Sequence, residues 1–246
     1  MPAGASHRNA IPLYEFPNQY VARHLITETP LRISSLRALG GFANVFAIES
    51  MMDELAAACG ADPLAFRLRH LKDPRAKAVI ERAGQMASWK PGKGDGTRGM
   101  GIGFCKYKNL GSYCAVIVEV ALEEKLRVLR AWAAVDVGRV VSPDGVINQI
   151  EGGIVQAASW TLKEAVRFDP NFITSRDWDA YPILTFAESP RVEVQLIDRP
   201  AEPSKGAGEG AQGPTGAAIA NALFNASGVR VRELPLTRER IVAHMG

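Results

Sequence analysis

Residues 88–99 constrain the fold most, because the residue pattern of the chain changes across them. This stretch combines Trp89-Lys90-Pro91 with glycines at every second or third position, a composition typical of a linker. Before it, apolar residues recur at helical spacing, and after it they form runs typical of strands. We therefore expect a first segment, residues 1–87, and a second segment, residues 100–246, joined by this linker.

The first segment is expected to hold three helices. One runs from Asn44 to Gly60, a natural C-cap. The other two begin at Asp62-Pro63 and Asp73-Pro74, because an Asp N-cap followed by proline suits a first helical turn. Several prolines make residues 1–35 irregular or extended.

Three acidic residues on the first helix are assigned to a solvated face. They are Glu49, Asp53 and Glu54. Carboxylates are seldom fully buried unless they are paired, so a solvated face is the expected position for all three.

The second segment begins with strands and continues with a long helix. The strands are expected at residues 100–107, 113–122 and 126–137. The helix runs from Ser142 to about Glu164 and contains Gly152-Gly153. Each interior glycine costs about 1 kcal/mol relative to alanine, so we expect a close packing partner there. A further strand, Val192 to Ile197, follows.

Composition excludes several classes of protein. The 246 residues are 47% hydrophobic with a net charge of +3, which is globular and predicts neither a nucleic acid nor an anionic membrane as partner. No apolar run is long enough for a transmembrane helix, and the N-terminus lacks the apolar core of a signal peptide. Cys59, Cys105 and Cys114 are isolated and suit a reducing compartment, which predicts a cytoplasmic location. The scattered histidines predict no protein-ligated metal site.

The stretch from Ser204 to Phe224 is the strongest candidate site. It opens as a glycine-dense loop, in which glycines permit positive φ and close approach of a ligand or another backbone. Glu209 is its one carboxylate, placed before a helix whose free N–H groups favour an anion. A solvated surface turn is the plainer alternative. The glycine spacing does not match a dinucleotide fingerprint, and a Gly-Lys-Ser/Thr phosphate loop is absent.

Six short motifs follow one another along nearly the whole chain. They are Arg37-Ala38-Leu39-Gly40-Gly41, Asp53-Glu54-Leu55-Ala56, Asp136-Val137-Gly138, Gln149-Ile150-Glu151-Gly152, Ser204-Lys205-Gly206-Ala207-Gly208-Glu209 and Ala226 to Pro235. In this order they resemble the C-terminal third of the molybdopterin-binding subunit of the xanthine dehydrogenase/aldehyde oxidase family. The closest likeness is to the branch of isoquinoline oxidoreductase and nicotinate dehydrogenase large subunits.

The resemblance implies an α+β fold, a molybdenum-cofactor-binding domain with a helical N-terminal segment and a mixed sheet with long helices. It also implies the chemistry: Glu209 matches the family's catalytic base, which makes a water-derived oxygen nucleophilic. Arg37, Ala38 and Gly208 match positions at the molybdopterin cofactor. In a partly dry pocket, desolvation is expected to raise the pKa of Glu209. Gln149 and Glu151 are given a structural role.

The implied reaction is oxidative hydroxylation of an N-heteroaromatic compound or an aldehyde. Leu39, which stands where the family has phenylalanine, and Gln212 are the expected substrate contacts. The implied partners are an upstream molybdopterin-binding chain that shares the cofactor, and a separate [2Fe-2S] subunit. Export to the periplasm with a signal-bearing partner stays open. The alternative is a non-catalytic assembly partner or folded remnant that binds no cofactor alone.

Overall fold

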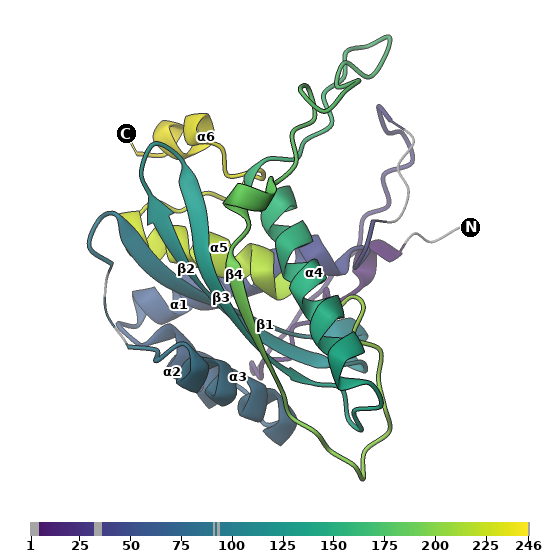
Figure 1. Ribbon diagram of the computed structural model, residues 1–246, viewed down its shortest axis with the longest axis vertical. Coiled ribbons are helices and arrows are strands. Elements are labelled where there is room, and N and C mark those ends of the chain that lie inside the picture. Colours follow the sequence, from purple (N-terminus) through teal and green to yellow (C-terminus); the bar gives the residue numbers. More distant parts are fainter. Residues whose placement is uncertain (1–4, 32–35, 91, 93, 246) are drawn as a thin grey trace.

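A four-stranded sheet forms the centre of the molecule. The computed structural model describes residues 5–31, 36–90, 92 and 94–245. The strands are β1 (Arg98–Lys106), β2 (Tyr113–Leu122), β3 (Leu126–Asp136) and β4 (Arg191–Leu196). They lie in the order β1-β2-β3-β4, with antiparallel pairing except between β3 and β4, which are parallel (Figure 1). The sheet is therefore mixed, which confirms the α+β fold with a mixed sheet.

Helices cover both faces of this sheet (Figure 1). They are α1 (Gly41–Ala58), α2 (Pro63–Arg69), α3 (Pro74–Met86), α4 (Pro143–Leu162), α5 (Gln212–Ser227) and α6 (Arg238–Ala243). Short 3-10 helices are η1 (Ala5–His7), η2 (Tyr107–Asn109) and η3 (Phe186–Glu188). None of the helices in the described ranges combines the length and apolar character that a bilayer crossing requires.

Local capping signals decide where several helices begin and end. Asp62, Asp73 and Ser142 each accept a hydrogen bond from a backbone N–H two or three residues later, which confirms the predicted starts. α1 begins at Gly41, slightly earlier than expected. Gly60 follows its end with φ of 61°, the left-handed conformation that glycine adopts readily after a helix.

The two faces of the sheet hold separate apolar clusters, because successive side chains of a strand point to opposite faces. On one face α4 and α5 pack over Val116 and Ala133. On the other, α2 and α3 pack over Ile117 and Trp132. Helices of the first segment therefore share a core with strands of the second. The division of the chain at residues 88–99 stays a prediction.

The backbone of α5 lies directly on β1, because every second residue of this strand from Gly99 to Gly103 is glycine. A Cβ atom at Gly101 would lie 2.2 Å from the carbonyl oxygen of Ala218. At Gly103 it would lie 2.2 Å from that of Pro214, in the first turn of α5. This close approach holds the start of α5, and the loop before it, against the end of β1.

The predicted solvated face of α1 is wrong for two of its three acidic residues. Glu49 is 1% exposed and Asp53 is 5% exposed, whereas Glu54 is half-buried. The reason is Arg67 of α2, whose fully buried guanidinium lies 2.8 Å from Glu49 and 3.6 Å from Asp53. A buried charge is tolerated when it is paired, so the arginine draws both carboxylates inward. Tyr14 also donates to Glu49 at 2.7 Å.

The expected packing partner of the glycine pair in α4 is confirmed for one of the two glycines. A Cβ atom at Gly153 would lie 3.2 Å from the Cβ of Ala211 and 3.0 Å from the side-chain amide of Gln212, at the start of α5. Gly152 has open space instead. Gly153 therefore lets α4 approach the same end of α5 that carries the candidate loop.

Two extended segments project from this body (Figure 1). The chain between α4 and η3 makes a long excursion in which an isolated bridge joins Phe168 and Ile173. In this excursion Trp178 is 72% exposed. Residues 17–31 form the second projecting segment, in which Tyr20 is 92% exposed. Both segments present apolar side chains to solvent.

Candidate active site

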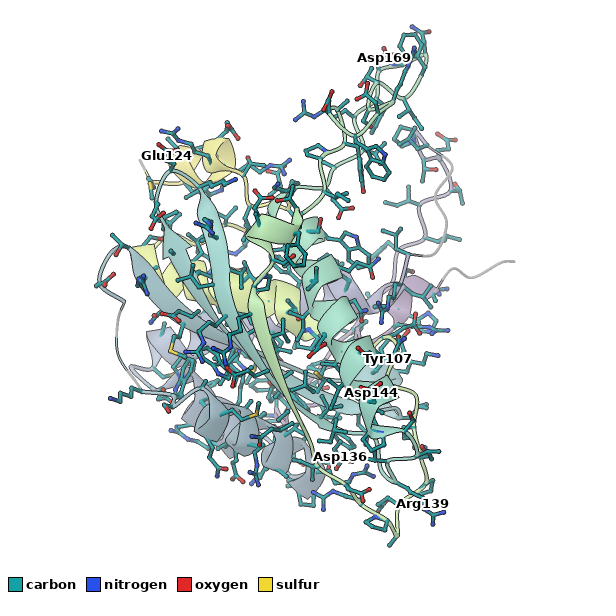
Figure 2. All side chains as sticks on the ribbon, in the orientation of Figure 1. Tyr107, Glu124, Asp136, Arg139, Asp144 and Asp169 are labelled. Carbon is teal, nitrogen blue, oxygen red and sulfur yellow. The ribbon has the colours of Figure 1, made fainter. Side chains whose placement is uncertain are left out.

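Glu209 lies in the loop between β4 and α5, where three parts of the chain meet. Its Oε1 accepts a hydrogen bond from the backbone N–H of Ala38, in the turn before α1, at 2.9 Å. Its Oε2 accepts one from the hydroxyl of Tyr107, the first residue of η2 just after β1, at 2.8 Å. In Figure 2, Tyr107 lies at the same end of the molecule as Asp144, which is at the start of α4. The Glu209 side chain is half-buried, so both oxygens are held while the group keeps access to solvent.

Unusual backbone conformations gather around this carboxylate. Ala38 and Leu39 have φ of 75° and 53°, and Asn9, Lys108 and Asn109 have φ of 57° to 59°. Elsewhere in the described ranges, a single non-glycine residue has positive φ. Such conformations cost about 1–3 kcal/mol each and cluster at functional sites, where surrounding contacts hold them. Here the contacts include the Asn9 side chain, which accepts from the backbone N–H of Lys108 at 2.9 Å.

In the stretch from Ser204 to Phe224, the glycines of α5 serve close packing, and no glycine forms a left-handed turn. None of those between residues 204 and 216 has positive φ, so this part of the prediction is wrong. The predicted close approach is confirmed. A Cβ atom at Gly213 would lie 2.7 Å from that of Val45, and one at Gly216 would lie 2.8 Å from the Phe42 ring. α1 can therefore pack tightly against α5 and carry the Ala38 turn to Glu209.

The predicted rise in the pKa of Glu209 is also wrong. Burial raises this pKa, but the hydrogen bonds from Ala38 and Tyr107 and the positive charges of Lys108 and Arg8 together lower it below its ordinary value. We expected the free N–H groups at the N-terminus of α5 to stabilise this carboxylate. The donors come instead from Ala38 and Tyr107, in other segments of the chain. The carboxylate is therefore ionised, and ready to accept a proton, at neutral pH.

Arg37 lies beside Glu209 with its guanidinium directed at acceptors of α4 and of the loop. Its Nε donates to the carbonyl oxygen of Gly208 at 2.5 Å. Its Nη2 donates to Oε1 of Gln149 at 3.0 Å, and Nη1 to Oε1 of Gln156 at 3.3 Å. Burial lowers the pKa of Arg37, and the charge of Glu209 partly opposes this shift. The structure thus brings together Arg37, Ala38, Gly208 and Glu209; their roles at a cofactor stay predictions.

The two predicted substrate residues lie at different depths. Leu39 is half-buried in the strained turn before α1. Gln212 is fully buried at the start of α5. In the amide orientation that satisfies both of its ends, Gln212 accepts from Arg37 Nε at 2.7 Å and donates to the carbonyl oxygen of Glu209 at 3.1 Å. Its side chain therefore holds the loop to Arg37. Substrate contact by either residue stays a prediction.

Sequence reasoning missed Tyr107 and Gln156, and it gave Gln149 a purely structural role. Gln149 and Gln156 are seven residues apart, so they share one face of α4, and this spacing could have pointed to them. Tyr107 carried no such signal. It reaches Glu209 because β1 ends under the first turn of α5, a contact between residues far apart in the sequence.

The sequence model of a family described as "Molybdopterin cofactor-binding domain" matches residues 48–190, and a second one with the same description matches residues 2–71. The chain belongs to this family, and it represents part of a molybdopterin-binding subunit of the xanthine dehydrogenase type. This confirms the resemblance.

Two curated relatives place it in one branch of the family. The chain is 39% identical to a nicotinate dehydrogenase subunit of Pseudomonas putida KT2440, over 97% of this chain and 22% of the relative. It is 33% identical to the beta subunit of isoquinoline 1-oxidoreductase of Brevundimonas diminuta, over 91% of this chain and 29% of the relative. The chain therefore spans less than a third of the length of these relatives.

Solved structures share the fold. Quinoline 2-oxidoreductase from Pseudomonas putida 86 superposes with a TM-score of 0.71 at 16% identity, covering 85% of this chain and 52% of that chain. Aldehyde oxidoreductase from Desulfovibrio desulfuricans gives a TM-score of 0.72 at 16% identity, covering 86% and 41%. At this identity the likeness establishes the fold alone.

The residues around Glu209 fit the cofactor that the family implies. A molybdopterin offers ring N–H and carbonyl edges and a phosphate, which guanidinium and carboxamide groups can bind. Arg37, Gln149 and Gln156 form such a set on one side of the loop. At Gly206, no atom lies within 4 Å of the position that a Cβ atom would take, so the loop is open there. Among the described residues no group of three or more His, Cys, Asp or Glu could hold a metal ion by itself.

Proposed function

We propose that this chain is the base-bearing part of a molybdenum hydroxylase large subunit. The observation that carries the proposal is the Glu209 carboxylate, held between the Ala38 N–H and the Tyr107 hydroxyl, two donors that favour its ionised form. A general base must be ionised at the working pH and fixed in position, and Glu209 meets both conditions. The reaction is oxidative hydroxylation with water as the source of the oxygen atom.

The chain's own residues contribute the base and its orientation. When bound, the molybdenum cofactor supplies the two-electron redox step. Glu209 takes the proton from the water-derived oxygen, which makes that oxygen nucleophilic toward an electron-poor carbon. Each carboxylate oxygen has two lone pairs and accepts one hydrogen bond from Ala38 or Tyr107, so acceptor capacity remains for the proton. Arg37 and Gly208 hold the cofactor side of the loop.

The names of two relatives support the proposed substrate class. Nicotinate dehydrogenase and isoquinoline 1-oxidoreductase are named for N-heteroaromatic substrates, which supports a ring hydroxylated beside its nitrogen. An aldehyde is the second proposed substrate, as the resemblance to the xanthine dehydrogenase/aldehyde oxidase family implies. Leu39, at the position of an aromatic residue in the family, and Gln212 remain our proposed substrate contacts.

A partner chain completes the site in this proposal. The relatives are themselves named as subunits, which supports assembly with further chains. The two projecting segments, residues 17–31 and the excursion after α4, expose apolar side chains that a partner would cover. We propose that an upstream molybdopterin-binding chain shares the cofactor, that iron–sulfur clusters lie on a separate subunit, and that the complex is cytoplasmic.

The test compares the chain expressed alone with the chain co-expressed with its upstream gene neighbour. Molybdenum and pterin content are measured in both, followed by turnover with nicotinate, isoquinoline and an aromatic aldehyde. Glu209→Gln should abolish turnover and leave the cofactor content unchanged. Glu124→Gln, the same chemical change in the exposed turn between β2 and β3, is the matched control. Wild-type turnover in Glu209→Gln would refute the role of Glu209.

The second candidate function is a non-catalytic assembly partner or folded remnant. One observation favours it: the guanidinium of Arg37 is already bonded within the chain, to Gly208, Gln149 and Gln156. A cofactor would have to exchange some of these contacts. Absence of cofactor both alone and with the neighbour would establish this second function and reduce Glu209 to a loop carboxylate.

A further inference from the structure

Tyr107 and Arg8 form a chain of hydrogen bonds that ends at Glu209. Arg8 Nη1 donates to the Tyr107 hydroxyl oxygen at 3.2 Å. The Tyr107 hydroxyl donates to Glu209 Oε2 at 2.8 Å. A guanidinium has donors only, so the single proton of the phenol is left for the carboxylate. Arg8 therefore fixes the direction of the hydroxyl as well as adding positive charge.

The structure around Tyr107 holds its ring in place. The residue is 6% exposed. Its backbone N–H donates to the carbonyl oxygen of Ser112 at 2.9 Å, and its own carbonyl accepts from Gly111 at 2.7 Å. The next two residues, Lys108 and Asn109, take the left-handed conformation, which closes the turn just after Tyr107.

Asn9 stabilises this strained turn. Its amide nitrogen donates to the carbonyl oxygen of Lys106 at 2.8 Å and to the side chain of Asn109 at 3.0 Å. Its amide oxygen accepts from the N–H of Lys108 at 2.9 Å. One side chain thus ties down the residue before Tyr107 and the two after it. Strain that surrounding contacts maintain in this way is typical of residues held for a functional geometry.

We propose that Tyr107 is the positioning residue of this site, with its hydroxyl, oriented by Arg8, holding the Glu209 carboxylate in the geometry needed for proton transfer. This inference rests on the proposed role of Glu209 as the base. Tyr107 itself stays protonated, because burial and the hydrogen bond to Glu209 raise the pKa of its phenol to about 12. It acts as a donor throughout and exchanges no proton with the substrate.

The proposal predicts a change in how Glu209 titrates. The groups that face its carboxylate are Tyr107, the N–H of Ala38, and the charges of Lys108, Arg8 and Arg37. Tyr107→Phe removes one donor to the ionised form and leaves the others, so the pKa of Glu209 should rise. The acid limb of the kcat profile should move to higher pH in parallel.

The experiment uses two readouts. In the full chain, carbon-13 resonances of labelled glutamates are followed against pH, with Glu209 identified by its loss in Glu209→Gln. In the assembled enzyme, kcat and KM are measured. Tyr107→Phe should raise the titration midpoint, lower kcat by about tenfold and change KM by less than about twofold, since positioning errors act on the transition state. Arg8→Gln should shift both readouts in the same direction.

Tyr113→Phe is the matched control. The Tyr113 hydroxyl donates to Asp73 Oδ2 at 2.8 Å, a tyrosine–carboxylate pair of the same chemistry on the face of the sheet that α3 covers. This variant should leave the Glu209 titration and kcat unchanged. If Tyr107→Phe behaves like Tyr113→Phe in either readout, the positioning role is overturned. Failure of the proposed function would look different: Glu209→Gln would keep turnover, whatever the titration of Glu209 shows.

Discussion

Replacing Arg67 by methionine should destabilise the fold strongly, because this side chain is the cation of a buried ionic cluster. Arg67 Nε donates to Glu49 Oε2 at 2.8 Å, Nη2 to the Glu49 carbonyl oxygen at 2.8 Å, and Nη1 to the Pro63 carbonyl oxygen at 3.0 Å. Methionine fills similar space but removes the positively charged partner of the Glu49 carboxylate, which keeps only the neutral donors Tyr14 and the Phe104 N–H. Asp53 keeps a partner in Arg230 at 3.0 Å, so Glu49 bears most of the loss.

Removing one partner of a buried ion pair costs about 3–5 kcal/mol in the free energy of unfolding. With a urea m-value of about 2–3 kcal/mol/M, the midpoint of Arg67→Met should fall by about 1–2 M. The assay is urea denaturation followed by far-UV circular dichroism. The double variant Arg67→Met/Glu49→Gln should recover part of the loss, because it removes the uncompensated carboxylate.

The deficit of Arg67→Met should also depend on pH. Burial raises the pKa of Glu49, and the contact with Arg67 opposes this shift. Without Arg67 the folded-state pKa of Glu49 rises further above its unfolded value. A carboxyl whose pKa is higher in the folded state than in the unfolded state stabilises the fold at pH values below its unfolded-state pKa. This contribution is lost as the pH rises through the folded-state pKa. The deficit should therefore be larger at pH 8 than at pH 5. A loss below about 1 kcal/mol at pH 8, or one independent of pH, would refute this reasoning.

Three further predictions concern packing and a second ion pair, each measured by urea denaturation. Gly101→Ala should cost about 1–3 kcal/mol or more, because its Cβ would lie 2.2 Å from the backbone of α5. Gly152→Ala, with open space around it, should stabilise the chain by up to about 1 kcal/mol; a loss there would contradict the packing of α4. Burial raises the pKa of Asp136, but hydrogen bonds from Arg75, a backbone N–H and Arg199 lower it by more, so the pKa lies below its ordinary value. The stability gap between wild type and Asp136→Asn should therefore be present above about pH 4 and shrink as pH falls below it; a constant gap would count against the ion pairs.

Local signals in the sequence predicted most elements of the fold. Asp62, Asp73 and Ser142 cap helices where their positions indicated, since an N-cap bond joins residues only two or three apart. Strand positions followed from runs of apolar residues. Glu209 could be singled out because it stands in a glycine-dense loop within a familiar order of motifs.

Tertiary contacts decided what these local signals could not. Glu49 and Asp53 are buried because they form ion pairs with the buried Arg67 on another helix. Tyr107 reaches Glu209 across 102 residues of sequence. The pKa of Glu209 falls rather than rises because donors from two other segments outweigh burial.

The sequence by itself therefore determined most of the elements, three of the helix caps, the family and the identity of the candidate base, since each is encoded in a short stretch or in the order of such stretches. The tertiary structure alone decided which charges lie inside, which donors hold Glu209 and in which direction its pKa moves. Burial and electrostatic interaction depend on distances in space, and helix packing brings together residues whose separation along the chain carries no sign of their contact.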